Sequence, residues 1–226
     1  MTHYDGGDSG TERLDTQHKG QELRFTIIPP QDVNAVSAGQ LAALHEKNFP
    51  DYYLTQLGTP LLTSFYLHFL SHPNNLCVIA TGASGVDGLA LFVDDYDTQM
   101  AAFYRKYWRS LVVGILRGFL RHPARVLVGT FKRVAGLFSH DSVIVPNLPR
   151  VTLLSIVVES SIRGKGLGRE LVQTGTAALS ARGVSTYYLS VVATNTAAIA
   201  FYEKIGLAIV SQTGRKVLMV GTTDED

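Results

Sequence analysis

The sequence of 226 residues has little of several features that would assign a protein to a class at once. Cys77 is the only cysteine, which excludes an internal disulfide framework and a cysteine-rich metal site and favours a reducing compartment. The N-terminus lacks the apolar segment of a signal peptide, and no hydrophobic run approaches the roughly 20 residues that span a bilayer. The formal net charge is only +1, so the whole chain gives no electrostatic reason to expect nucleic acid. We therefore expect a cytoplasmic protein, soluble or peripheral, that binds neither metal nor nucleic acid.

The residues that are present suit one folded domain with polar ends. Hydrophobic residues make up 46% of the chain and charged residues 17%, which is enough to bury a substantial core. Residues 1–21 carry too little apolar surface to offset the entropy of ordering them, so we predict a disordered N-terminal tail. The domain is expected over residues 22–221, and residues 222–226 are expected to form an acidic tail.

Hydrophobic periodicity and turn residues predict a series of strands and helices along this domain. The run "RVTLLSIVV" has no polar alternation, which is typical of a strand covered on both faces. In chain order, the prediction is a strand over 22–30, helices over 31–49 and 60–72, a β-hairpin over 75–93, a strand over 150–158, a helix ending at Gly183, a strand over 185–192, a helix over 195–206 and two strands over 207–221.

The segment that follows the hairpin is basic and has no acidic residue from Gln99 to His140. Eight of the 20 Lys and Arg residues of the chain lie in it. The spacing predicts an amphipathic helix that ends near Pro123 and is followed by a second helix. The predicted apolar face contains Tyr104, Trp108, Leu111, Ile115 and Phe119, and the predicted basic face contains Arg105, Lys106, Arg109, Arg117 and Arg121. Three hypotheses follow: binding of a phosphorylated ligand, peripheral membrane contact through residues 100–138, and packing on the domain or another subunit.

"IRGKGLGREL", residues 162–171, places three glycines at alternate positions beside three cations. Glycine lets the backbone approach a ligand closely, and the first N–H groups of the following helix have no internal partner. The helix dipole adds positive charge there, so a phosphate or pyrophosphate is the favoured ligand. A P-loop needs Gly-Lys-Ser/Thr, but Lys165 is followed by Gly166. A dinucleotide fingerprint needs a third glycine where Arg169 stands, so neither pattern fits.

Two motifs resemble those of the GCN5-related N-acetyltransferase (GNAT) superfamily. The run "RGKGLG", residues 163–168, is similar to the Gln/Arg-x-x-Gly-x-Gly/Ala loop by which that superfamily holds the pyrophosphate of acetyl-coenzyme A (acetyl-CoA). "NTAAIAFYEKIGL" resembles its second signature, Asn-x-x-Ala-x-x-Phe-Tyr-x-x-x-Gly-Phe, with Leu207 at the last position. The resemblance implies a mixed α/β (α+β) fold. Its sheet would be largely antiparallel, with about seven strands flanked by helices and a helical insertion over about residues 97–140 between strands 3 and 4.

The resemblance also implies which residues hold the coenzyme. Backbone groups of Ile156, Val157 and Val158 would meet the pantetheine arm and the thioester, and Asn195 would bind the arm from the next helix. The pyrophosphate would lie on Arg163, Gly164, Lys165, Gly166, Leu167, Gly168 and Arg169.

Tyr202 is the expected general acid for acetyl transfer. Asn195, Ile199 and Tyr202 lie at i, i+4 and i+7, so one helical face presents both the amide and the phenol. A phenol with a pKa near 10 stays protonated at neutral pH and can donate to a departing thiolate. The general base is open: the alternatives are Glu159, His45, Glu46, Asp94, Asp95 and a water chain.

These residues predict an enzyme, an acetyl-CoA-dependent N-acetyltransferase that acts on a primary amine without metal. The basic segment favours a small-molecule acceptor, such as an amino sugar or another phosphorylated compound, and a protein or peptide amine is the alternative. A non-catalytic acyl-CoA-binding or sensing module that kept the loop and lost turnover is the competing function. A homodimer is a further hypothesis, because the apolar face of the basic segment would suit another subunit.

Overall fold

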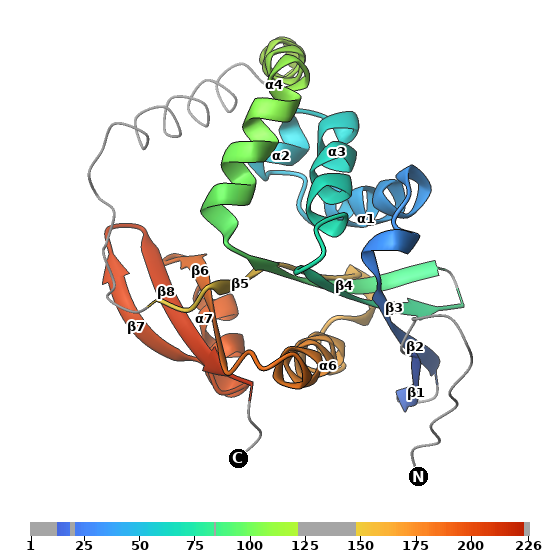
Figure 1. The fold of residues 1–226 in the computed structure, drawn as a ribbon, viewed down its shortest axis with the longest axis vertical. Coiled ribbons are helices and arrows are strands. Elements are labelled where there is room, and N and C mark those ends of the chain that lie inside the picture. The colour runs from blue at the N-terminus through green and yellow to red at the C-terminus, as the bar shows by residue number, and fades with distance from the viewer. Residues whose placement is uncertain (1–12, 19–20, 84, 122–147, 224–226) are drawn as a thin grey trace.

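The computed structural model describes residues 13–18, 21–83, 85–121 and 148–223. One eight-stranded sheet runs through them in the order β1-β2-β3-β4-β5-β6-β8-β7 (Figure 1). Neighbouring strands are antiparallel except for β5 and β6, which are parallel. The predicted fold class, a largely antiparallel mixed sheet flanked by helices, is confirmed.

The strands are β1 (Arg13–His18), β2 (Gln21–Ile28), β3 (Leu76–Gly82), β4 (Gly85–Asp94), β5 (Val151–Val158), β6 (Thr186–Val192), β7 (Ala208–Thr213) and β8 (Lys216–Thr222). The helices are α1 (Ala35–Asn48), α2 (Tyr53–Gln56), α3 (Thr59–Leu70), α4 (Tyr96–Arg121), α6 (Leu167–Ala181) and α7 (Thr196–Lys204), with short 3-10 helices η1 (Pro30–Asp32) and η2 (Ser160–Ile162).

The first strand, β1, lies in the segment predicted to be a disordered tail, and it adds an eighth strand to the predicted seven. It pairs with β2 along its whole length, from Arg13 opposite Thr26 to His18 opposite Gln21. The stretch predicted to be disordered thus contains a strand, which backbone hydrogen bonds to β2 hold in the sheet. Residues 1–12, 19–20 and 224–226 lie outside the described residues.

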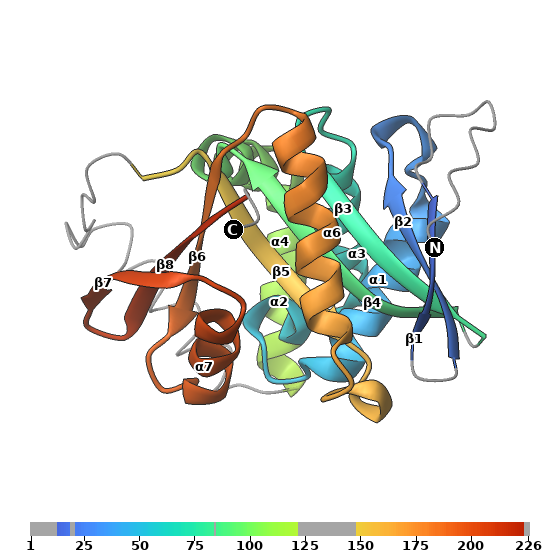
Figure 2. The same cartoon turned by 90° about the horizontal axis from the view of Figure 1, so that it is seen from below.

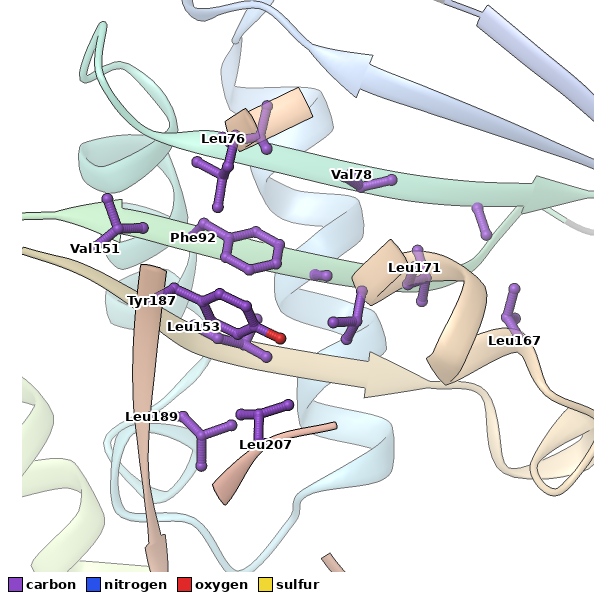
Figure 3. Close-up of a cluster of buried hydrophobic side chains, with 14 of the residues drawn as sticks. Leu76, Val78, Phe92, Val151, Leu153, Leu167, Leu171, Tyr187, Leu189 and Leu207 are labelled. Carbon is purple, nitrogen blue, oxygen red and sulfur yellow. The ribbon is translucent and has the colours of Figure 1, made fainter. Parts of the chain in front are cut away.

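Helices cover both faces of the sheet, and each face has its own hydrophobic cluster (Figure 1). The helices α1, α3 and α4 pack on one face, where Leu41, Leu62 and Phe65 are buried. The helices α6 and α7 lie on the other face. There, Leu171 of α6 and Phe92 of β4 belong to the cluster drawn in Figure 3.

The central strand β4 is buried on both faces, which explains its nearly continuous apolar sequence. Leu89 and Leu91 join the cluster under α1 and α3, whereas Ala90 and Phe92 join the cluster under α6. The helix α6 comes very close to this strand, because a Cβ atom built on Gly175 would lie 2.2 Å from the Phe92 ring. A glycine at this position therefore allows the helix to reach the sheet.

The predicted helical insertion is present as α4, between β4 and β5. Leu111 and Ile115 of its predicted apolar face pack against the cluster under α1 and α3. The other three residues of that predicted face, Tyr104, Trp108 and Phe119, are 39%, 56% and 47% exposed, so they do not pack on the domain. The predicted second helix falls outside the described residues, and no helix within those residues is long and apolar enough to cross a membrane.

Glycines explain why the buried face of α4 differs in part from the predicted apolar face. Gly114 and Gly118 are buried, and a Cβ atom on Gly114 would lie 2.9 Å from the carbonyl oxygen of Leu57. The helix thus makes its closest approach to the α2–α3 connection through glycines. A hydrophobicity pattern gives little weight to glycine, so it points to the larger side chains on the neighbouring surface instead.

Candidate active site

The sheet opens between its two parallel strands, β5 and β6. Only two residue pairs join them, Val151 with Tyr187 and Thr152 with Tyr188. Beyond these pairs the strands diverge (Figure 2). The later residues of β5 therefore have neighbours in β4 on one side and an open edge on the other.

A β-bulge in β5 accounts for this opening. Leu91 of β4 is opposite Ser155, but the next residue, Phe92, is opposite Leu153, so Leu154 is an extra residue in β5. A bulge bends its strand and increases the local twist. The bend lies immediately after the last pair with β6, where the two strands separate.

The bulge also reverses which residues of β5 face α6. Val151 and Leu153 point to the α6 cluster before the bulge, and Ile156 and Val158 point to it afterwards. The odd-numbered residue Val157 is buried in the opposite cluster. One extra residue has therefore shifted the alternation of the strand by one position.

Main-chain groups of β5 face the opening at alternate positions. The N–H of Glu159 donates to the carbonyl of Asp87 in β4 at 2.8 Å. Alternation along an antiparallel ladder then turns the groups of Val157 toward β4 and those of Ile156 and Val158 toward the opening. The carbonyl of Val158 accepts a hydrogen bond from Arg163 Nε at 3.0 Å, which leaves Ile156 as the clearest backbone contact for a ligand arm.

The glycine segment turns the chain from β5 into α6 through left-handed backbone conformations. Gly164 has φ 77° and Gly166, at the N-cap of α6, has φ 98°. These values favour glycine over residues with a side chain. Residues 163–166 are exposed, and the positive end of the α6 dipole lies beside them. This loop therefore has the exposure and charge that an anionic ligand requires.

Fewer N–H groups of the glycine loop are available to an anion in the structure than the sequence predicts. The N–H groups of Arg169 and Glu170 both donate to the carbonyl of Gly166, at 2.9 and 3.2 Å. The amide of Arg169 is thus used inside the helix, and its side chain remains as the part that can meet a phosphate. The side chain of Leu167 is buried in the core, so only its main chain can serve a ligand.

The two sequence motifs meet at Gly168. A Cβ atom on this residue would lie 3.3 Å from Cζ of Phe201 in α7 and 3.7 Å from Cδ1 of Ile156 in β5. The third glycine of the loop therefore serves close packing between α6, α7 and β5. Its role differs from that of Gly164 and Gly166, which set the path of the loop.

The helix α7 has Asn195 as its N-cap residue and carries Tyr202 on its inner side. Oδ1 of Asn195 accepts a hydrogen bond from the N–H of Ala198 at 3.2 Å, as an N-cap residue does. Ile199 and Tyr202 pack against the α6 cluster. Burial raises the pKa of Tyr202 to about 12, and the neighbouring Tyr52 adds to the rise. The phenol therefore stays protonated throughout the physiological pH range.

Glu159, one candidate for the general base, is held by other groups. It forms an ion pair with Lys47 at 2.9 Å and accepts hydrogen bonds from the N–H and the hydroxyl of Ser160, at 2.9 and 3.0 Å. The hydrogen bond from Lys47 is the main cause that lowers the pKa of Glu159. These contacts describe a carboxylate that caps η2 and ties the loop to α1.

His45, a second candidate, is connected to β5 through a tyrosine. Its Nδ1 lies 2.8 Å from the hydroxyl of Tyr66, and that hydroxyl also hydrogen-bonds Ser155 in β5. Burial lowers the pKa of His45 to about 4. Its Nε2 is buried and has no hydrogen-bond partner among the described residues. This imidazole is therefore neutral at physiological pH, and one of its ring nitrogens has no partner in the described part of the chain.

The remaining base candidates lie elsewhere. Asp94 and Asp95 stand opposite the beginning of β5, at the end away from the glycine loop, and Asp94 pairs with Arg150 at 2.5 Å. Glu46 follows His45 and accepts a hydrogen bond from the Thr59 hydroxyl at 2.7 Å. No group of three or more His, Cys, Asp or Glu side chains within the described ranges is arranged to hold a metal ion.

Residues 112–207, which include both motifs, match the acetyltransferase (GNAT) family. This part of the chain is therefore similar to GNAT acetyltransferases. Over 59 residues it is 44% identical to the ribosomal protein bS18-alanine N-acetyltransferase of Escherichia coli K12, a match that spans 26% of this chain and 40% of that relative.

Solved structures share the GNAT fold over most of the chain. SsHAT has a TM-score of 0.58 at 21% identity, covering 89% of this chain and 99% of its own. The PaiA N-acetyltransferase of Thermoplasma acidophilum, solved in complex with coenzyme A, has a TM-score of 0.52 at 13% identity, covering 88% and 98%. The E. coli ribosomal-protein-S18-alanine N-acetyltransferase has a TM-score of 0.51 at 17% identity, covering 89% and 96%.

Two aromatic residues near the candidate site were missed in the sequence. Tyr66 lies in a helix whose apolar pattern indicates only burial, and Tyr52 lies in a connection with no motif. Tyr66 joins His45 to β5, and Tyr52 lies near both His45 and Tyr202. Neither has a local pattern that separates it from an ordinary core or surface tyrosine.

Proposed function

We propose that the protein is an N-acetyltransferase that moves the acetyl group of acetyl-CoA to a primary amine. The opening between β5 and β6 carries this proposal, because it lies directly before an exposed loop suited to a diphosphate. An extended pantetheine arm can lie along the main chain at Ile156 while its diphosphate meets the residues from Arg163 onward. Tyr202, on α7, is expected on the other side of that arm.

Acetyl transfer requires one bond to form, one bond to break and two protons to move. The acceptor nitrogen forms a bond to the acetyl carbon while the carbon–sulfur bond breaks, and its electron pair leaves on sulfur. The amine loses one proton and the sulfur gains one, so free thiol and amide are the products. With a pKa of about 12, Tyr202 is a weaker acid than a thiol of pKa about 8.5. We therefore assign it to donate a hydrogen bond to the charge that develops on sulfur.

For the amine proton, the contacts favour His45 over Glu159. Its Nε2 has no hydrogen-bond partner among the described residues, and this geometry carries the preference, since burial lowers the pKa of the imidazole to about 4 and makes it a weaker base. In the tautomer that donates from Nδ1 to Tyr66, Nε2 carries the lone pair that accepts a proton. Glu159 is engaged by Lys47 and Ser160, which supports a capping role for it.

Thiol release tests the activity. Acetyl-CoA is mixed with a panel of amines, amino sugars and peptides, and Tyr202→Phe is compared with the exposed-residue control Tyr104→Phe. We expect Tyr202→Phe to lower kcat about 100-fold with little change in coenzyme affinity, as for the loss of one transition-state hydrogen bond. Unchanged turnover would remove Tyr202 from the reaction. Tight binding with no thiol release across the panel would favour a non-catalytic acyl-CoA-binding module.

A protein or peptide amine is the second candidate for the acceptor. It is favoured by the similarity to an enzyme whose name places its activity on an alanine of ribosomal protein bS18. That similarity spans 40% of the relative, so the peptide arm of the panel decides between the two acceptor classes. Acetylation of peptides at rates well above those for amino sugars would replace the small-molecule acceptor.

We further propose that α4 contacts an anionic membrane surface. Trp108, Leu116 and Phe119 are exposed on this helix, with the exposed cation Lys106 nearby in the sequence. Exposed apolar side chains beside cations are typical of interfacial helices. Flotation with anionic vesicles is expected to recover the protein in a salt-sensitive manner. A rise in molecular mass with protein concentration, without vesicle binding, would support a homodimer instead.

A further inference from the structure

A cavity of about 690 Å³ lies between α4 and the connection from α2 to α3, and neither GNAT motif lines it. Residues 55–61 form one wall, and α4 forms the facing wall from Arg109 to Gly118. Glu46 and Pro50, at the end of α1, complete the lining. The α4 wall belongs to the helical insertion between β4 and β5. One wall of the cavity is therefore formed by a segment that lies outside the central sheet.

Positive charge reaches the cavity from two elements. Arg109 and Arg117 line it from α4, about two helical turns apart. The first turn of α3, which begins at Thr59, lines the opposite wall and adds the positive end of a 12-residue helix dipole. The Thr59 hydroxyl in this turn donates a hydrogen bond to Glu46 at 2.7 Å. The two guanidinium groups are therefore the part of the cavity suited to a phosphate.

Thr55 gives an independent indication of a polar ligand. It lines the cavity and is only 8% exposed, yet its hydroxyl has no hydrogen-bond partner among the described residues. Buried hydroxyl groups in folded proteins are nearly always hydrogen-bonded. A ligand oxygen in the cavity would supply the missing partner.

The cavity adjoins the coenzyme loop through the last turn of α1. Glu46 lines the cavity, and the next two residues contact the glycine-loop region. Lys47 pairs with Glu159 at 2.9 Å, and Asn48 accepts a hydrogen bond from Arg163 at 2.7 Å. A molecule held in the cavity is therefore separated from the coenzyme loop by a single turn of helix.

We propose that this cavity binds the phosphate of the acceptor, so that the substrate is a phosphorylated primary amine. The proposal rests on the acetyltransferase function proposed above. Arg109 and Arg117 hold the phosphate, and the carboxylate of Glu46, beside the first turn of α3, faces the ammonium end of the same molecule. The opposite charges within one cavity thus match a compound that carries both an amine and a phosphate.

Inorganic phosphate is the first probe, and it is titrated into protein already saturated with coenzyme A so that the glycine loop is filled. We expect amide NMR shifts at Thr55, Gly58 and Thr59 that saturate with phosphate. Arg117→Gln is expected to weaken this binding at least 10-fold. The matched control Arg105→Gln, on the same helix but outside the cavity lining, should leave it unchanged. Equal phosphate affinity in both variants would overturn the proposal.

Turnover then separates phosphate recognition from acetyl transfer itself. An amino sugar phosphate is compared with the same amino sugar without phosphate. We expect a KM at least 10-fold lower for the phosphorylated compound, and Arg117→Gln should abolish that advantage while leaving the unphosphorylated compound unaffected. Equal KM values with active enzyme would refute the phosphate site and leave the acetyltransferase function in place. Saturable NMR shifts on addition of phosphate, without any thiol release, would support the phosphate site and refute the acetyltransferase function.

A soluble phosphate ester and a lipid head group share this chemistry. Vesicles of phosphatidylethanolamine, whose head group carries an amine beside a phosphate, form the second arm of the assay. Turnover of the vesicle lipid in preference to the amino sugar phosphate would support the phosphate site and identify a lipid source. Turnover of the soluble compound alone would support the site and exclude the lipid.

Discussion

Acidification is expected to destabilise the protein through His45. Its side chain is 8% exposed and lies among aromatic rings, with Phe49 at 5.2 Å and Tyr66 at 5.9 Å between ring centroids. Burial lowers the pKa of this imidazole from 6.5 to about 4. The unfolded chain therefore binds a proton at this residue at a higher pH than the folded chain does. The stabilising contribution is complete above pH 6.5 and is lost as the pH falls toward 4.

The magnitude follows from the two pKa values. At pH 7.5 His45 is neutral in both states, so it adds almost nothing to the pH dependence. At pH 5.0 the residue is nearly fully protonated in the unfolded chain and about one tenth protonated in the folded chain. The free energy of unfolding should therefore fall by about 2 kcal/mol between these pH values because of this one residue. Burial also lowers the pKa of His68, which acts in the same direction.

Urea unfolding of the wild type and of His45→Gln, followed by circular dichroism at both pH values, isolates this contribution. Glutamine does not titrate, so other groups cancel when the two proteins are compared at each pH. The stability gap between wild type and His45→Gln should shift by about 2 kcal/mol from pH 7.5 to pH 5.0, against the wild type. A gap that stays constant within 0.5 kcal/mol, or an NMR titration of His45 with a midpoint near 6.5, would refute the reasoning.

Two further expectations concern glycines. Gly175→Ala places a methyl group against the Phe92 ring and should destabilise the protein by about 1–3 kcal/mol in urea unfolding, whereas Gly39→Ala, in a helix with nothing within 4 Å of the new methyl group, should stabilise it by about 0.5–1 kcal/mol. A neutral Gly175→Ala would contradict the packing described for α6, and a destabilising Gly39→Ala would contradict the open space beside this residue of α1. Gly166→Glu should weaken coenzyme binding at least 10-fold by calorimetry, since it adds a negative charge at a left-handed N-cap, while Gly166→Asn tolerates that backbone and should bind far better. Equal affinities for these two variants would argue against an anion at the loop.

The features that were predicted from sequence are those with local causes. The glycine loop is recognisable because positive φ values at Gly164 and Gly166 select one residue type. The strand β4 is recognisable because burial on both faces removes polar alternation. In both cases the physical requirement acts on consecutive residues, so it leaves a pattern that can be read without neighbours in space.

The features that escaped prediction depend on partners distant in sequence. His45 has an ordinary helical sequence around it, and its neutral state arises from aromatic residues brought together by α1 and α3. The strand β1 is ordered by β2, although its own residues are polar. The buried face of α4 is set by the approach of Gly114 to Leu57, which hydrophobicity does not register. Each depends on a pairing that only the folded chain creates.

The bulge at Leu154 links the fold to the proposed chemistry. A regular parallel pair between β5 and β6 would use the main-chain groups of Ile156 in a sheet ladder, where no ligand could reach them. One extra residue redirects the strand, leaves those groups at an open edge and turns Ser155 toward Tyr66 and His45. A single irregularity thus provides both a place for an extended ligand arm and a connection to the candidate base. No side chain of β5 needs to be catalytic for this, which explains why a strand without acidic residues can still form the centre of the site.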